Sequence, residues 1–152
     1  MTSRRLATIE DLKQAGWTAS VDDGFVGLAG PIWQLLGDTE VTCGFFAEEK
    51  HKNRSGRVHG GMLATLADRA LGLTARRRDP SRKQVTIDLN IQFIDAAHLG
   101  DFVTATGKLL RETSTLAFLS GQIRADDRLI ANVSGIWRIL STDHRQESES
   151  QG

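Results

Sequence analysis

The chain has 152 residues, which is enough for one domain with a single hydrophobic core and too few for two ordinary domains. Hydrophobic residues make up 39% of it and charged residues 25%, proportions that exclude a fibrous or largely disordered protein. Nineteen basic and nineteen acidic residues give a formal net charge of zero. This balance disfavours nucleic acid as the main partner, because nucleic-acid-binding proteins usually carry a basic excess.

The sequence also bears on the cellular compartment. Cys43 is the one cysteine, which excludes an internal disulfide and fits a reducing compartment. No apolar run approaches the roughly 20 residues of a membrane span. Arg4 and Arg5 are not followed by the apolar run of a signal peptide. We therefore expect a cytoplasmic protein with no membrane partner.

The first part of the chain predicts short elements separated by turns. Thr8 and Asp11 have the spacing of a capping box, which predicts a short helix that Gly16 ends. Residues 25–36 are apolar but are interrupted by glycines and a proline, so this stretch is expected to be irregular or an edge strand. Residues 39–47 have the composition of a strand.

The second part predicts one long helix and then several strands. From Gly60 to Arg78 apolar residues cover most of the helical circumference, so this helix is expected to be buried. Strands are predicted at 85–94, 102–110, 116–124 and 129–140. The simplest arrangement is an α+β fold, an antiparallel β-sheet wrapped around one long central α-helix. Residues 1–140 then form a single domain, and the polar residues 141–152 are predicted to be disordered.

Chemistry is most plausible where the polar loop 51–59 enters the long helix. Gly60 and Gly61 lie at its start, where backbone N–H groups are free and a partial positive charge favours an anion. Glycine lets a ligand approach these groups closely, so Gly60 and Gly61 could contact substrate and form an oxyanion hole. Asp68 lies farther along the same apolar helix. A buried acid is costly, so it requires partners or a catalytic role as base or nucleophile.

The distance between these groups predicts a shared site. Gly60 and Asp68 are separated by about 12 Å of helix rise at ~1.5 Å per residue. One reacting carbonyl needs its donors and its base within about 3 Å each. Two antiparallel copies of the helix would bring Gly60 of one copy to Asp68 of the other. A catalytic site built from these residues therefore predicts a homodimer, with each site shared across the interface.

This segment contains the pattern Asn53-x-x-Gly56-x-x-His59-Gly60-Gly61, followed after six residues by Asp68. These six positions resemble the motif of the hotdog-fold acyl-CoA thioesterases of the PaaI-like, 4-hydroxybenzoyl-CoA thioesterase-related group. The resemblance extends from Phe25 to Leu140. It implies a central helix wrapped by an antiparallel sheet, and dimers that often pair into tetramers.

The resemblance also implies the reaction, the hydrolysis of an acyl-CoA thioester to free acid and coenzyme A. Asp68 would be the nucleophile or general base, and the Gly60 N–H would polarise the thioester carbonyl. Asn53 and His59 would hold or orient the reacting groups. Thr86 aligns with a hydroxyl residue that often assists the water or the acid, where serine is a common alternative.

The position of Thr86 conflicts with the predicted strand 85–94. Thr86 lies on the polar side of this strand, opposite the apolar series that should pack on the helix. A place in the site requires either that this side meets a partner chain or that the strand contains a local bulge.

Basic residues cluster at the end of the long helix and just after it: Arg76, Arg77, Arg78, Arg82 and Lys83. They could simply interact with the helix dipole and with solvent. Alternatively, Arg76, Arg77 and Arg82 could bind the phosphates of coenzyme A.

Two other functions on the same fold remain open, a non-catalytic acyl-thioester-binding protein and a dehydratase or hydratase. Hydrolysis needs no metal or redox cofactor, and His51, His98 and His144 lack the spacing of a metal site. The pocket for the acyl group could include Phe25, Met62 and Phe93.

Overall fold

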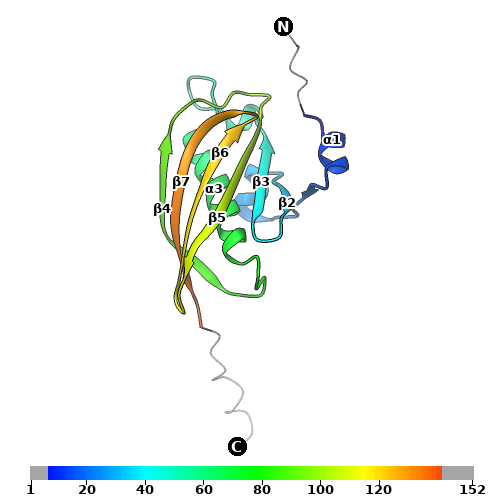
Figure 1. Ribbon diagram of the computed structural model, residues 1–152. Coiled ribbons are helices and arrows are strands. Elements are labelled where there is room, and N and C mark those ends of the chain that lie inside the picture. Colours follow the sequence, from blue (N-terminus) through cyan, green and yellow to red (C-terminus); the bar gives the residue numbers. More distant parts are fainter. Residues whose placement is uncertain (1–6, 142–152) are drawn as a thin grey trace, which may run out of the picture.

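A computed structural model describes residues 7–141 of the chain. Figure 1 shows one long helix against a broad sheet, with the short N-terminal elements at one side. The elements in chain order are α1 (Ile9–Gln14), β1 (Thr18–Ala19), α2 (Gly24–Ala29), β2 (Trp33–Leu36), β3 (Val41–Phe46), a 3-10 turn at Glu49–His51, α3 (Gly60–Ala75), β4 (Gln84–Phe93), β5 (Phe102–Glu112), β6 (Leu116–Ala125) and β7 (Arg128–Ile139). The predicted tail 141–152 lies outside the described residues except for its first residue.

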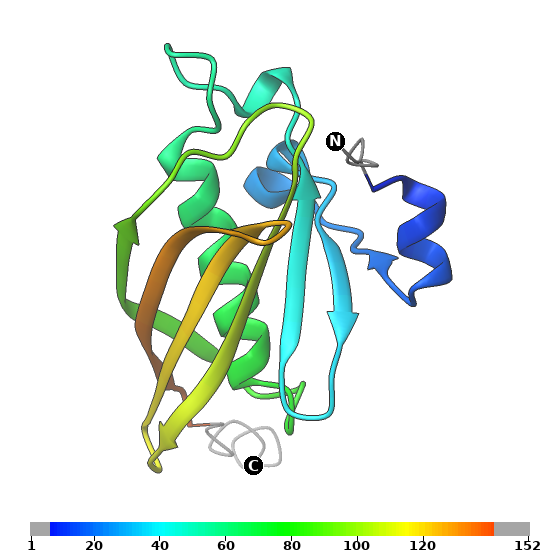
Figure 2. The same cartoon turned by 45° about the horizontal axis from the view of Figure 1, so that its top comes forward.

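The seven strands form one antiparallel sheet in the order β1-β2-β3-β5-β6-β7-β4. Helix α3 lies against one face of this sheet (Figure 2) and packs on β3, β5 and β6. The predicted α+β arrangement of a sheet around one central helix is confirmed. Strand β4 is at the edge of the sheet and pairs, among the described strands, with β7 alone. No described helix is long and apolar enough to cross a membrane.

Helix α3 has one covered face and one open face. The covered face carries buried apolar side chains such as Leu66, Ala67 and Leu71. Leu71 fits over Gly107 and Gly121, where an added Cβ would come within 2.9 and 3.1 Å of its side chain. The face away from the sheet is only half-buried or exposed along its length. The expectation that the whole helix is buried is therefore wrong, because the small residues Gly61, Ala64 and Gly72 lie on the uncovered face.

Two further expectations meet different outcomes. The capping box is confirmed: the Thr8 side chain accepts from the Asp11 N–H at 3.2 Å, and the Asp11 carboxylate accepts from the Thr8 N–H at 2.9 Å. Gly16 ends this region with a φ of 89°, in the left-handed region that glycine adopts readily. Residues 24–29 are a helix and not irregular or strand structure, which corrects the expectation for the first half of 25–36.

Candidate active site

A bulge in β4 determines where Thr86 points. Thr86 pairs with Trp137 and Asp88 pairs with Ile136, so Ile87 is an extra residue without a partner of its own in β7. Leu89, beyond the bulge, packs against the core, whereas Ile87 is 54% exposed. The bulge turns Thr86 toward α3. Of the two alternatives for placing Thr86 in the site, a partner chain against the polar side of the strand or a local bulge, the structure has the bulge. The expectation that Val85 and Ile87 pack on the helix is wrong for this reason.

Thr86 contacts Asp68 directly. Its Oγ1 donates a hydrogen bond to Asp68 Oδ1 at 2.6 Å, joining β4 to the open face of α3. Asp68 is half-buried in the single chain and not enclosed by apolar side chains, which corrects the expected burial. A hollow of about 220 Å³ lies around the pair and is lined also by Arg76, Gln84 and Trp137. Substrate or water can therefore reach the carboxylate.

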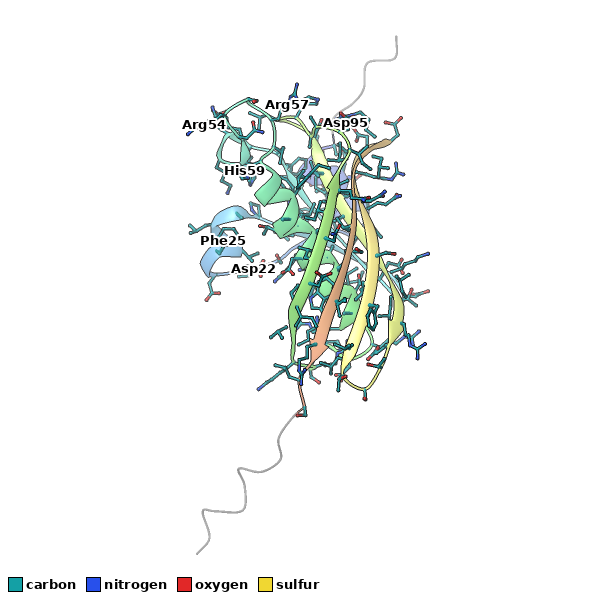
Figure 3. The ribbon with its side chains drawn as sticks, turned by 90° about the vertical axis from the view of Figure 1, so that its left-hand side faces the viewer. Asp22, Phe25, Arg54, Arg57, His59 and Asp95 are labelled. Carbon is teal, nitrogen blue, oxygen red and sulfur yellow. The ribbon has the colours of Figure 1, made fainter. Side chains whose placement is uncertain are left out.

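The loop before α3 is held by its own hydrogen bonds. Asn53 Oδ1 accepts from the N–H groups of Ser55 and Arg57 at 2.9 and 3.1 Å. Gly56 has a φ of 75°, which explains a glycine at this turn. Asn53 is thus a loop-organising residue in the single chain. Figure 3 labels Arg54 and Arg57 on this loop and His59 at the start of α3.

His59 is the N-cap of α3. Its Nδ1 accepts a hydrogen bond from the Gly61 N–H at 2.8 Å, so the N–H of Gly61 is already occupied. No described residue accepts from the N–H of Gly60. Gly60 lines a hollow of about 620 Å³ together with Asn53 and Phe93. A Cβ at Gly60 would lie 3.2 Å from Phe93 Cζ, which leaves little room there for a side chain.

The expected site residues therefore form two groups. Asp68 and Thr86 share one hollow, and Gly60 and Asn53 share another. Neither hollow contains residues of the other group. Within one chain the Asp68 carboxylate therefore lies with the Thr86 hydroxyl, and the Gly60 N–H lies with the loop of Asn53. The Asp68 carboxylate and the Gly60 N–H do not share a hollow.

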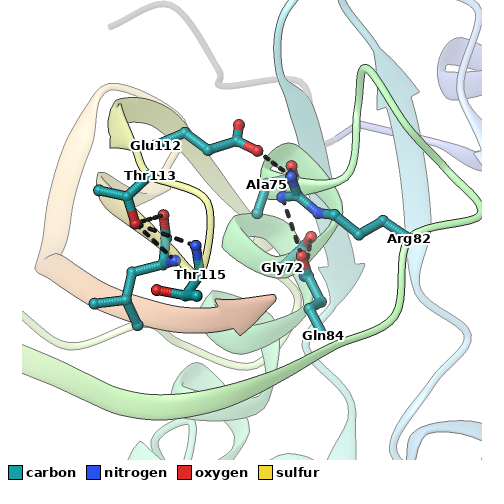
Figure 4. A network of polar contacts seen from close by, with 8 residues as sticks. Gly72, Ala75, Arg82, Gln84, Glu112, Thr113 and Thr115 are labelled. Carbon is teal, nitrogen blue, oxygen red and sulfur yellow. Dashed lines mark hydrogen bonds and ion pairs between the residues drawn. The ribbon is translucent and has the colours of Figure 1, made fainter. Parts of the chain in front are cut away.

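The three arginines expected to bind phosphate differ in their contacts. Arg77 Nε donates to the Gly37 carbonyl at 2.8 Å. Arg82 binds Glu112 and the Ala75 carbonyl at the end of α3 (Figure 4). Arg76 is half-buried and lines the hollow of Asp68, and its guanidinium has no hydrogen-bond or ion-pair partner among residues 7–141. Arg77 and Arg82 thus stabilise the fold around the C-terminus of α3, and Arg76 is the one with a free guanidinium.

Three residues near the site were missed. Arg69 forms an ion pair with Asp22 at 2.6 Å, which ties the open face of α3 to the segment before α2. Gln84 Nε2 donates to the Gly72 carbonyl at 2.8 Å beside Asp68. Gln84 precedes Thr86 by two residues, so strand periodicity could have placed it on the same side. The Asp22–Arg69 pair spans 47 residues and has no local signal.

Cys43 is buried in β3, as expected for a packed cysteine. Burial raises the pKa of its thiol from 9.0 to about 12, so it is not a nucleophile near neutral pH. No three histidine, cysteine or acidic side chains within the described part of the chain gather where they could hold a metal ion.

Comparisons with known proteins agree on one family. A model of the thioesterase superfamily matches residues 55–131. A Pseudomonas aeruginosa protein named as a candidate esterase is 31% identical over 131 residues, which cover 79% of this chain and 98% of that protein. Human acyl-coenzyme A thioesterase 13 is 34% identical over 94 residues, covering 60% of this chain and 67% of that protein. The crystal structure of zebra fish thioesterase superfamily member 2 has a TM-score of 0.71 and 28% identity, and covers 88% of this chain and 99% of that chain.

Proposed function

The chain belongs to the thioesterase superfamily and has its hotdog fold, and we propose that it hydrolyses an acyl-coenzyme A thioester to the free acid and coenzyme A. The observation that carries this proposal is the Asp68 carboxylate, held by Thr86 on the open face of α3. The similarity to acyl-coenzyme A thioesterase 13 supports the substrate class.

Asp68 and the Gly60 N–H divide the chemistry between them. Thr86 binds Asp68 Oδ1, which leaves Oδ2 to act. As a general base, Oδ2 takes a proton from water while the water oxygen bonds to the thioester carbon. As a nucleophile, Oδ2 bonds to that carbon itself, and water later hydrolyses the anhydride. In both routes the carbonyl oxygen becomes an oxyanion that accepts from the Gly60 N–H, and the carbon–sulfur bond breaks to release the coenzyme A thiolate, which takes up a proton.

Each site is shared between two copies of the chain. Gly60 and Asp68 are about 12 Å apart along α3 by helix rise, which is too far for one reacting carbon. Their separate hollows support the same division. The edge strand β4 carries the exposed apolar side chains Val85 and Ile87, and a second β4 is a suitable cover for them. The assembly is a homodimer, and two dimers can pair into a tetramer.

The remaining predicted residues support these two groups. Asn53 shapes the loop that carries Gly60, and His59 orients the first turn of α3 by accepting from Gly61. Arg76 is the proposed contact for a phosphate of coenzyme A, since its guanidinium has no partner among the described residues and lines the hollow of Asp68. Arg77 and Arg82 would have to give up their bonds to Gly37 and Glu112 in order to bind phosphate. The proposed reaction requires no metal or redox cofactor.

The test is release of free thiol from a panel of acyl-CoA thioesters. We expect Asp68→Asn to lower kcat by about 100-fold or more, since general acid–base catalysis contributes about 10²–10⁴-fold. Asp88→Asn is the matched control, because Asp88 is exposed on β4 and lies outside the hollow of Asp68. Equal rates for wild type and Asp68→Asn would overturn the catalytic role and favour a non-catalytic acyl-thioester-binding protein.

A further inference from the structure

Helix α2 exposes two large apolar side chains on one face. Phe25 is 69% exposed and Leu28 is 78% exposed, and a spacing of three residues puts them side by side. Figure 3 shows α2 beside the first half of α3, with Phe25 and His59 labelled. Side chains of this size usually avoid water when packing partners are within reach. We therefore expect a ligand or another chain to cover Phe25 and Leu28.

The exposure does not come from a loosely held segment. At the start of α2 the ion pair between Asp22 and Arg69 joins the chain to α3 at 2.6 Å. At its end the buried ring of His51 donates from Nε2 to the Ala29 carbonyl at 2.6 Å. The two ends of α2 are thus bonded to α3 and to the loop before it, which carry the proposed catalytic groups. These bonds fix the positions of Phe25 and Leu28 relative to the site.

An apolar hollow of about 450 Å³ lies between α2 and the start of α3. Phe25, Leu28, Ala29 and Met62 supply its apolar lining. Its size is within the range of pockets that bind small molecules, about 300–1,000 Å³. His59 and Gly61, which flank Gly60 on either side, line the same hollow. A group placed here therefore lies next to the proposed position of the thioester carbonyl.

The hollow on the other side of Gly60 has a different character. Its lining is mixed: Asn53, Arg57, Asp95 and His98 lie beside apolar residues such as Phe93. The first turn of α3 thus separates an apolar hollow from one that is more polar. An acyl-CoA has the same division, with an apolar acyl group on one side of the thioester and a polar, anionic carrier on the other.

We infer that the hollow between α2 and the start of α3 is the acyl subsite and takes an apolar acyl group several carbons long. Phe25 and Leu28 then determine the specificity for acyl chain length. This inference rests on the proposed thioester hydrolysis. Bringing the acyl group onto Phe25 and Leu28 removes apolar surface of both partners from water. An acetyl group is too short to cover these side chains and gains little from them.

The test compares acetyl-, hexanoyl- and decanoyl-CoA as substrates. For wild type we expect kcat/KM to rise with chain length. Phe25→Ser and Leu28→Ser should each lower the decanoyl-to-acetyl ratio of kcat/KM by about tenfold or more, the scale of discrimination in apolar pockets. Both residues are exposed, so these substitutions leave the core intact. Val21→Ser is the matched control, because Val21 is fully exposed on the same segment but does not line the hollow.

A second measurement separates this inference from the proposed function. Equilibrium binding of the three thioesters to Asp68→Asn protein, with and without Phe25→Ser, reports on the subsite without hydrolysis. Chain-length-dependent binding that Phe25→Ser abolishes supports the subsite even if wild type hydrolyses none of the thioesters, an outcome that overturns the proposed function alone. If Phe25→Ser leaves the decanoyl-to-acetyl ratio unchanged, the acyl subsite is overturned. If Phe25→Ser weakens the binding of all three thioesters equally and also lowers the native mass of the protein, the subsite is likewise overturned. That result would identify this surface as an interface between copies of the chain.

Discussion

Thr86 Oγ1 donates a hydrogen bond to Asp68 Oδ1 at 2.6 Å, across the gap between the edge strand β4 and the open face of α3. The contact exists because Ile87 bulges out of the pairing between β4 and β7. A regular strand would turn Thr86 away from the helix. The bulge therefore gives the carboxylate a fixed orientation and leaves its other oxygen free.

Removing the Thr86 hydroxyl tests whether this hydrogen bond serves catalysis. We expect Thr86→Val to lower kcat by about 10- to 100-fold, the equivalent of a hydrogen bond to a charged group. Thr86→Ser keeps the hydroxyl and should stay close to wild type. Thr86 is exposed, so neither substitution should change the free energy of unfolding by more than about 0.5 kcal/mol. Wild-type kcat in Thr86→Val would show that the hydroxyl has no catalytic part.

His51 tests how firmly α2 is joined to the loop before α3. Its Nδ1 accepts from the Glu48 N–H at 2.9 Å and its Nε2 donates to the Ala29 carbonyl at 2.6 Å. His51→Phe keeps an aromatic ring against Phe45 but loses both bonds. We expect it to lower the free energy of unfolding by about 1–3 kcal/mol in urea titrations. His51→Gln retains a donor and an acceptor and should lose less; an equal loss in both variants would argue against the hydrogen bonds as the cause.

Arg82 and Arg76 should respond differently to the loss of their charge. Arg82 lies mostly buried between Glu112 and the Ala75 carbonyl, so Arg82→Met should lower the free energy of unfolding by about 1–3 kcal/mol. Its KM for acyl-CoA should not change. Arg76→Met should raise KM severalfold without a loss of stability. A raised KM in Arg82→Met at unchanged stability would restore Arg82 as a phosphate contact.

Cys43 predicts a decline in stability at alkaline pH. Its thiol pKa is about 12 in the folded chain and 9.0 when exposed, because burial disfavours the thiolate. Above pH 9 the unfolded chain loses this proton while the folded chain keeps it, so the contribution to stability falls between pH 9 and about 12, by about 1.4 kcal/mol per pH unit. Cys43→Ala should show a shallower decline in urea titrations over this range. Native protein should also react slowly with thiol reagents at pH 8, and fast labelling would contradict the burial.

Local patterns predicted much of the fold. The capping box of Thr8 and Asp11 was a reliable signal because both partners lie within one turn. The strands from β4 onward and the start of α3 at Gly60 also follow from patterns of neighbouring residues. Helix α2 was not predicted, since its six residues include glycines and it is held by the distant Asp22–Arg69 ion pair.

The candidate site was less accessible to sequence alone. The spacing of Gly60 and Asp68 followed from helix geometry, and so did their separation within one chain. The contact between Thr86 and Asp68 depended on the bulge at Ile87, which arises from the register of β4 against β7. Alternation of apolar and polar residues carries no information on that register. The open face of α3 likewise depends on which elements the sheet leaves uncovered.

Gly60→Pro removes the proposed oxyanion donor with little change to the backbone. Proline is favoured at the first position of a helix, and His59 has a φ of −64° and a ψ of 136°, which suit a residue before proline. We expect kcat to fall by about 10²–10³-fold, the usual effect of losing one such donor. Gly60→Ala keeps the N–H and places a Cβ at the same 3.2 Å from Phe93, so it controls for crowding. A similar loss in both variants would attribute the effect to crowding.

The most direct test of a site shared between two copies is to co-express Asp68→Asn and Gly60→Pro chains and measure thioester hydrolysis by the mixed protein. Each variant alone should be nearly inactive. A mixed dimer has one site with both Asp68 and Gly60 intact, and random pairing makes half of the dimers mixed. The account predicts recovery of about a quarter of wild-type activity. A mixture no more active than the two variants alone would contradict the shared site.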